Sequence, residues 1–134
     1  MTGEDNLHKL LSMMQPKLQA EEYIFYSAPG KYGDHADLSP IASFCEEEGL
    51  TLVVPLAAAR AGGLAFTSTF KLITLTVHSS LEAVGLTGAV SGRLAQKGIS
   101  ANIFAAFYHD HIFVQTEKAE AALQALQELG NEFK

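Results

Sequence analysis

Two histidines, His109 and His111, have the spacing of a metal-binding pair on a β-strand. Residues at alternate positions of a strand lie on one face, so both imidazoles could reach the same ion. A metal site needs three or four ligands, however, and neither a cysteine nor a second histidine pair lies nearby in the sequence. We therefore expect no metal site and interpret His111 as a capping or pairing residue at a strand start. Asp110 lies in a predicted hairpin turn, where aspartate is common for local reasons.

His78, Ser79 and Ser80 are residue types that could supply a nucleophile and its base. A serine hydroxyl needs an adjacent base, and that base needs a third group to orient it. Neighbouring residues of a strand point to opposite faces, and no orienting group is evident. The glycines Gly85 and Gly88 lack the Lys-Ser/Thr and the flanking spacing of a phosphate-binding loop. Catalysis is therefore the least favoured function.

A strand and a helix must position these residues. Alternation of apolar and polar side chains predicts a long strand over residues 66–77, with one half-polar face. Residues 81–97 are predicted to be helical, and Gly98 ends the helix. Each of the glycines inside that helix costs about 1 kcal/mol relative to alanine, so they need a structural reason. They are Gly85, Gly88 and Gly92.

A predicted hairpin follows this helix. Residues 99–108 and 111–115 have the composition of two strands, and His109 and Asp110 form the tight turn between them. Thr116 is expected to cap a last helix. Its inner stripe comprises Ala119, Ala122, Leu123, Leu126 and Leu129.

The first half of the chain begins with an amphipathic pattern. Apolar residues at positions 7, 10, 11, 14 and 18 predict a helix that Asp5 caps and Pro16 ends. Residues 22–28 then predict a strand, and the glycine- and proline-containing stretch 29–37 predicts a loop.

A second helix is predicted after this loop. Ser39 has the residue type of an N-cap and Pro40 suits the first helical position, while Gly49 would end the helix. Its inner face would contain Ile41, Phe44 and Cys45, and we interpret Cys45 as a small core residue. Residues 50–55 predict a further strand, and residues 56–61 a short helix that Gly62 and Gly63 break.

Charge and composition exclude several classes of function. The chain has 134 residues, a net charge of −6 and no basic cluster, so nucleic acids and anionic membranes are not expected partners. The single cysteine excludes an intrachain disulfide and fits a reducing compartment. The polar start shows no secretory signal, and no apolar run is long enough to span a bilayer. We expect a cytoplasmic protein.

The two halves of the sequence repeat each other. Gly49 and Gly98, each followed by a strand, are 49 positions apart, as are Ile24 and Ile73 in the opening strands. The second half reads as strand-helix-strand-strand-helix, which with one more strand gives the split βαβ pattern. The first half is abbreviated and can borrow a strand from its neighbour. The fold class is therefore α+β, with antiparallel sheets that have helices on one face.

The runs Thr74–Gly88 and Gly98–Val114 resemble the ACT domain. The similarity is greatest to tandem ACT proteins related to the regulatory region of aspartate kinases and to amino-acid sensors, in particular small bacterial ACT proteins. It is strong over residues 70–130 and weaker at Gly49–Val53. The resemblance implies ferredoxin-like βαββαβ modules in tandem that pair side by side, with effector sites at module interfaces. We expect an N-terminal packing helix (1–19), an abbreviated module (20–66) and a complete module (67–134).

The resemblance also implies a ligand site beside the loop over residues 78–88. Backbone N–H groups near a helix start can bind a carboxylate there, and glycine lets the backbone approach a ligand. Asp110 could receive a cationic group, such as the ammonium of an amino acid. Tight helix packing for the glycines, and a satisfied core or interface amide for Asn102, are the alternatives. The candidate ligand-binding residues are Gly85, Leu86, Asn102, Ala106, Phe107, His109 and Asp110.

Three functions are compatible with this sequence. The first is a homodimeric regulatory protein that binds a free amino acid at a module interface, needs no cofactor and is not an enzyme. Its ligand would act by shifting populations, with a change of assembly or contact with a protein partner as the output. The second is a dimerisation or interaction scaffold without a ligand, and the third is a small enzyme.

Overall fold

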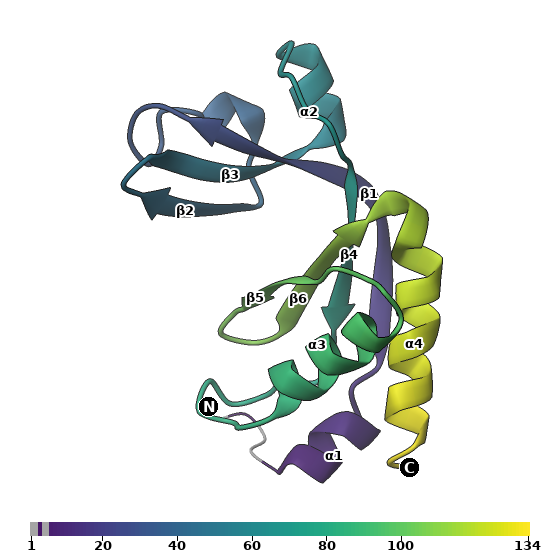
Figure 1. Ribbon diagram of the computed structural model, residues 1–134. Coiled ribbons are helices and arrows are strands. Elements are labelled where there is room, and N and C mark those ends of the chain that lie inside the picture. Colours follow the sequence, from purple (N-terminus) through teal and green to yellow (C-terminus); the bar gives the residue numbers. More distant parts are fainter. Residues whose placement is uncertain (1–2, 4–5) are drawn as a thin grey trace. The chain divides into compact units, whose positions relative to one another are not determined.

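The computed structural model describes Gly3 and residues 6–134, which form two compact units. The terminal unit contains the described residues up to Ala20 together with Lys71–Lys134, and the central unit contains Glu21–Phe70. Figure 1 labels the elements along the chain. They are α1 (Leu7–Ser12), β1 (Pro16–Ala28), the 3-10 turn η1 (Ala36–Leu38), β2 (Ala42–Glu46), β3 (Gly49–Pro55), α2 (Leu56–Ala61), β4 (Phe70–Leu75), α3 (Leu86–Gln96), β5 (Asn102–Ala105), β6 (Asp110–Gln115), the 3-10 turn η2 (Thr116–Lys118) and α4 (Ala119–Asn131).

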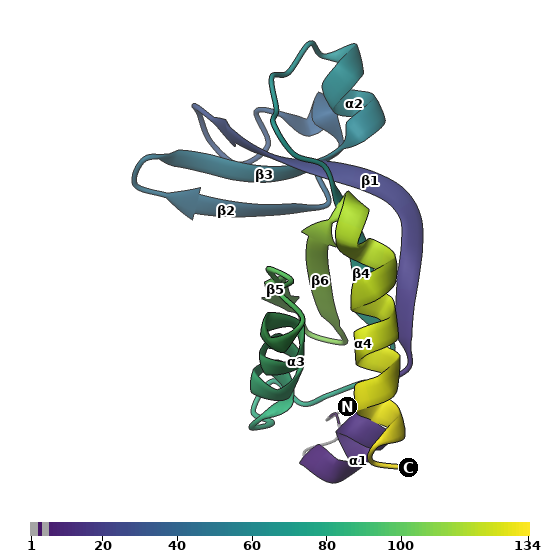
Figure 2. The ribbon, with the colours of Figure 1, turned by 45° about the vertical axis from the view of Figure 1, so that its right-hand side comes forward.

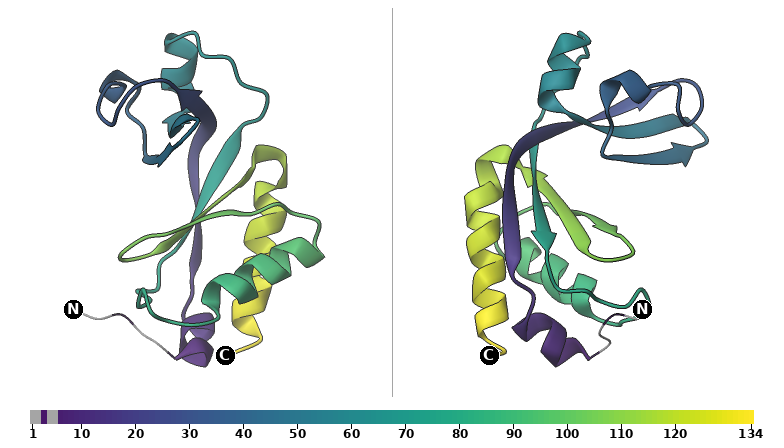
Figure 3. Two further views of the ribbon diagram at one scale, coloured as in Figure 1. Left: turned by 60° about the vertical axis from the view of Figure 1, so that its left-hand side comes forward. Right: turned by 180° about the vertical axis from the view of Figure 1, so that it is seen from behind.

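The terminal unit is a sheet covered by helices on one face. Its strands lie in the order β1-β4-β6-β5, and β5 and β6 form an antiparallel hairpin. The helices α3 and α4 lie on the same side of this sheet, as the front and rear views in Figures 1 and 3 show. Alternate residues of β4, Ile73 and Leu75, point into the core that these helices close. The other large members of this core include Leu10, Met14, Val90, Leu94, Ile112, Leu126 and Leu129.

The central unit is a smaller antiparallel sheet. Its strands lie in the order β2-β3-β1, and the chain connects β3 directly to α2 (Figure 2). The strand β1 contributes its residues from Glu21 onward to this unit and its earlier residues to the terminal unit. A separate core lies here, formed by Ile24, Ala28, Leu38, Leu50, Leu52, Val54 and Ala59. These observations confirm the predicted α+β class. The predicted module boundaries remain a prediction.

The predicted helix after Ser39 is wrong, because this segment forms strand β2. Ala42–Glu46 pairs with β3, so the neighbouring strand satisfies the backbone groups that a helix would have bonded internally. Ser39 ends η1 in a left-handed conformation, and a residue before proline avoids the helical region. The supposed inner face is exposed, with Phe44 at 66%. Cys45 is likewise exposed and is not a core residue.

The first helix is shorter than predicted. It runs over Leu7–Ser12, and Leu18 belongs to β1, which begins at Pro16. The cap is Asn6, whose side chain accepts a hydrogen bond from the Lys9 N–H at 3.0 Å. Asp5, the predicted cap, lies outside the described residues. The position before Pro16 disfavours helix, which explains why the chain becomes extended there.

Several boundaries around the predicted site also differ. Strand β4 covers only Phe70–Leu75, and α3 begins at Leu86, so the residues between them form a loop. The second hairpin turn lies at residues 106–109, where the Ala106 N–H donates to the His109 carbonyl. Asp110 is therefore the first residue of β6 and not part of the turn. Thr116 begins η2 instead of capping α4.

Two predicted strands have other bounds: β5 covers only Asn102–Ala105 of the predicted 99–108, and β1 begins at Pro16 instead of Glu22. Three other predictions are confirmed. Strand β3 covers Gly49–Pro55, α2 covers Leu56–Ala61, and Gly98 closes α3 in a left-handed conformation. Within the described residues, none of the helices has both the length and the apolar composition needed to cross a membrane.

Candidate functional site

A small cavity lies where the loop between β4 and α3 approaches the β5–β6 hairpin, entirely within the terminal unit. Its volume is about 60 Å³, the space of roughly two water molecules. A polar carboxylate, that of Asp110, belongs to its wall. The lining residues are Ser79, Ser80, Leu81, Ala83, Leu86, Thr87, Ala105, Ala106 and Asp110.

A larger hollow adjoins this cavity. It measures about 290 Å³ and shares three lining residues with the cavity, namely Ser79, Ser80 and Leu81. Its other walls come from Gly3, His78, Glu82 and Phe107. Pockets that bind small molecules commonly measure about 300 Å³ or more. The cavity and hollow together reach that size, whereas the cavity alone does not.

Asp110 is the chemically unusual residue of the cavity. The residue is only 6% exposed, and no hydrogen bond to its carboxylate is found among the described residues. Burial raises the pKa of this carboxyl, while the nearby His111 and His109 act in the opposite direction. None of the fully buried side-chain N or O atoms of the described residues lacks a hydrogen-bond partner, so the Asp110 oxygens keep some access to solvent. A cation entering the cavity could reach them there.

The two neighbouring histidines are fixed to β4 and the loop that follows it. The His111 ring Nδ1 lies 3.1 Å from the Thr74 hydroxyl, and the His109 Nδ1 lies 3.3 Å from the Val77 carbonyl. Burial lowers the pKa of His111, and His109 lowers it further. Within the part of the chain that the structure describes, no group of three or more His, Cys, Asp or Glu is placed to hold a metal ion.

The start of α3 forms another wall of the cavity. Leu86 and Thr87 are the first two residues of this eleven-residue helix. The first N–H groups of a helix have no partner within it, and together with the helix dipole they favour a negative charge. The cavity therefore joins an acidic side chain and a helix start that attracts anions. These two features would match the ammonium and carboxylate of a zwitterion.

Gly85 determines where α3 begins, but it does not line the cavity. Its φ of 105° is left-handed, a conformation that glycine adopts without steric cost. A Cβ at this position would lie 2.8 Å from Cδ2 of Leu7, so the side chain of α1 packs against the glycine. Nothing lies within 4 Å of the corresponding positions at Gly88 and Gly92, both of which are inside α3.

The structure brings together four of the seven predicted ligand-binding residues. Leu86, Ala106 and Asp110 line the cavity, and Phe107 lines the adjoining hollow. Gly85 and His109 line neither space. Asn102 lies away from both, and its amide donates to the Phe113 carbonyl across the hairpin at 3.4 Å.

The serines of the loop line the cavity, although no binding role was predicted for them from the sequence. Ser79 is buried, and the Ser80 hydroxyl accepts a hydrogen bond from the Glu82 N–H at 3.1 Å. The Ser80 carbonyl also accepts a hydrogen bond from the Ala83 N–H, and this bond closes a β-turn. The sequence signal for this turn was the pair Ser79-Ser80 ahead of the helix that follows Gly85, because serine is common in turns.

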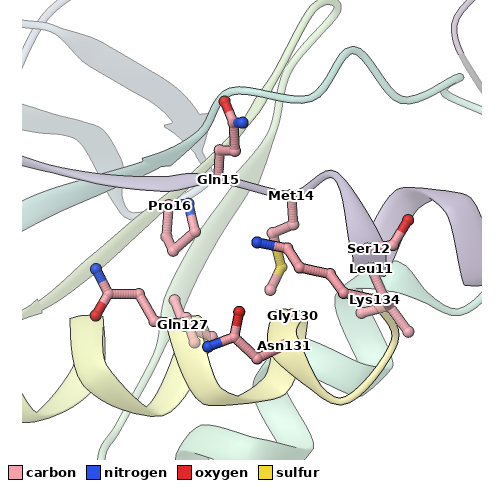
Figure 4. Close-up of a pocket in the computed structure, with 10 residues that line it drawn as sticks. Leu11, Ser12, Met14, Gln15, Pro16, Gln127, Gly130, Asn131 and Lys134 are labelled. Carbon is pink, nitrogen blue, oxygen red and sulfur yellow. The ribbon is translucent and has the colours of Figure 1, made fainter.

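Two further hollows lie elsewhere. One of about 340 Å³ separates the end of α1 from the end of α4, and Figure 4 shows Lys134 extending over Met14 while Gln15 points away. Its polar side chains are exposed, except for the half-buried Ser12. The other measures about 510 Å³ and lies in the central unit beside Leu50 and Leu52. Neither has a buried charged residue in its wall.

Comparison with known proteins identifies the fold. Two models, each described as an ACT domain, match residues 2–71 and residues 67–128. No curated protein matches the chain. Among solved structures, a protein of unknown function from Vibrio cholerae, described as a possible transport protein, is 54% identical over 92% of this chain and 95% of its own, with a TM-score of 0.84.

Two more distant structures share the fold. The regulatory subunit of aspartate kinase from Thermus thermophilus is 12% identical over 85% of this chain and 95% of its own, with a TM-score of 0.59. The corresponding subunit from Thermus flavus is 10% identical over 96% of this chain and 99% of its own, with a TM-score of 0.58. The matched family supports a regulatory role. The predicted ferredoxin-like modules are confirmed, and the chain belongs to the ACT domain family, with two ACT domains in tandem.

Proposed function

We propose that this protein binds a free amino acid in the cavity between the loop over residues 76–85 and the β5–β6 hairpin. The observation that carries the proposal is the carboxylate of Asp110, a largely buried residue, in a cavity whose other wall is the start of α3. The carboxylate would accept the ligand's ammonium group. The N–H groups of Leu86 and Thr87 would donate to its carboxylate.

The sizes of the cavity and of the adjoining hollow suit two different parts of an amino-acid ligand. A cavity of about 60 Å³ accommodates the charged groups, and the adjoining hollow of about 290 Å³ accommodates a side chain. Ala106 keeps the wall of the cavity small, and Phe107 offers an apolar surface to the side chain. The family relationship is in agreement, since ACT domains commonly serve as small-molecule regulatory modules.

The proposed output is a change of conformation or assembly, not catalysis. A ligand that contacts both the start of α3 and the start of β6 stabilises the arrangement in which these elements are close. We infer that the protein acts as a homodimer, whose association or contact with a protein partner responds to the ligand. The ligand shifts that equilibrium only by its difference in affinity for the two states.

A thermal-shift panel of the free amino acids tests the proposal. A ligand that binds only the folded state at about one hundred times its Kd stabilises it by about 2.7 kcal/mol. We expect at least one amino acid to raise the melting temperature of the wild type. Asp110→Asn should abolish that response, whereas the matched variant Asp37→Asn in the central unit should retain it. A wild type that responds to no amino acid at millimolar concentration would refute the proposal.

An interaction scaffold is the alternative, and one observation favours it. Four large apolar side chains around the same loop and hairpin are exposed, from 59% at Tyr108 to 83% at Val84. Such a patch is typical of a protein interface. Under this alternative, Val84→Ser disrupts self-association in sedimentation experiments, and Asp110→Asn changes neither assembly nor any ligand response.

A further inference from the structure

We infer that the amino acid bound at this site has a positively charged side chain, a guanidinium or an ammonium. This inference rests on the proposed function and adds the class of ligand. The charged residues that line the cavity and the hollow are Asp110 and Glu82, and no Lys or Arg is found among their described lining residues. One acidic group suits the ligand's own ammonium, so the second is available for another cation.

Glu82 is held at the wall of the hollow by its backbone. Its N–H donates to the Ser80 hydroxyl at 3.1 Å, and the turn is closed by the bond from the Ala83 N–H to the Ser80 carbonyl at 3.0 Å. The carboxylate therefore starts from a fixed backbone position, although its side chain is exposed. Exposure limits its contribution to binding but leaves it accessible to a ligand.

The aromatic wall of the hollow fits a cation as well. Phe107 lines the hollow, and its ring packs edge-on against Tyr108 with centroids 5.0 Å apart. Tyr108 in turn contacts His78, another residue of the hollow, at 5.2 Å. An ordered aromatic face attracts a guanidinium or ammonium through its quadrupole. The apolar stem of a long side chain would pack against Leu81 on the way to Glu82.

The experiment compares charged ligands with neutral counterparts of similar shape. Arginine and citrulline have nearly the same shape, but citrulline carries a neutral ureido group, and norleucine serves as the neutral counterpart of lysine. Binding is measured by isothermal titration calorimetry on the full chain at low and high salt. We expect arginine or lysine to bind about two- to fivefold more tightly than its neutral counterpart, as for exposed ion pairs. The preference should shrink at high salt.

Two variants test whether Glu82 causes the preference for a cationic ligand. Glu82→Gln should bring the ratio of arginine to citrulline affinity close to one while both ligands still bind. Glu120→Gln, which removes a carboxylate from the exposed surface of α4, should leave the ratio unchanged. A global effect of net charge would instead change the ratio equally in both variants and would overturn the assignment to Glu82.

The outcomes separate this inference from the proposed function. If citrulline binds as tightly as arginine, and Asp110→Asn still abolishes binding, then the inference is wrong and the amino-acid site stands. If no amino acid binds the wild type, the proposed function fails and the inference with it. A cationic preference that survives Glu82→Gln would also refute the role given to this residue.

Discussion

Alanine substitutions at the three glycines around the start of α3 should have opposite effects on stability. Gly88 and Gly92 lie within α3, are exposed, and have nothing within 4 Å of the position that an added methyl group would take. Alanine is more stable than glycine inside a helix by about 0.5–1 kcal/mol. Each of Gly88→Ala and Gly92→Ala should therefore raise the free energy of unfolding by that amount.

Gly85→Ala should instead destabilise the protein. The left-handed backbone at φ 105° costs a residue with a Cβ about 1–2 kcal/mol. The new methyl group would also lie 2.8 Å from Cδ2 of Leu7, and displacing that side chain to a poor rotamer costs about 0.5–1.5 kcal/mol. The lower entropy of the unfolded chain offsets about 0.4–1 kcal/mol. The expected net loss is about 1–3 kcal/mol.

Urea unfolding of the three single variants measures these differences. A double-mutant cycle with Leu7→Ala then isolates the contact, and we expect a coupling free energy of about 0.5–1.5 kcal/mol between positions 7 and 85. The same cycle between positions 7 and 92 is the control and should give a coupling near zero. The account would be refuted if Gly85→Ala were as stabilising as Gly92→Ala. A loss of ligand binding in Gly88→Ala would show that this glycine serves the ligand and not the helix.

Three further predictions concern charge and exposure. Burial raises the pKa of Asp110, so its contribution to stability is greatest at low pH and is lost as the pH rises through that pKa. At neutral pH, Asp110→Asn should therefore unfold at a higher urea concentration than the wild type. The pKa of His111 is lowered, so as the pH falls below about 6.5 this imidazole is protonated in the unfolded state before it is protonated in the folded state. The wild type should lose stability in this range, and His111→Gln should lose less stability in the same urea series. Phe44→Ser should change the free energy of unfolding by less than about 0.5 kcal/mol, since Phe44 is exposed. A decrease in the free energy of unfolding of about 3 kcal/mol would mean that Phe44 is buried.

The elements that the sequence predicted well are those whose local pattern and tertiary partners agree. Residues 50–55 are rich in apolar and β-branched side chains typical of a strand, and β3 ends at Pro55, directly before α2. The segment 41–49 shows the opposite case. Its apolar residues have helical spacing, but the backbone pairs with β3, a partner that spacing within the segment cannot reveal. Because of that pairing, the side chains expected on the inner face of a helix are exposed to solvent.

The residue types of the candidate site could be proposed from the sequence, whereas its geometry could not. Asp110 was identified as a possible cation acceptor, and the structure places it in the cavity wall. Its burial depends on the turn falling at residues 106–109, a shift that moves it from the turn into β6. Gly85 packs against Leu7, which lies far from it in the sequence. Packing between segments that are distant in the sequence cannot be read from local patterns, which is why the geometry of the cavity was not predicted.

The buried carboxylate also provides a physical reason for regulation. Without a ligand, desolvation of Asp110 opposes the close approach of the hairpin to the loop before α3. Under the proposed function, a cation in the cavity would remove this penalty only in the arrangement that encloses it, so the ligand would have a higher affinity for that arrangement. Differential affinity is the requirement for a population shift. An amide at position 110 would remove the penalty in every arrangement, and the protein would gain stability but lose the coupling between ligand and conformation.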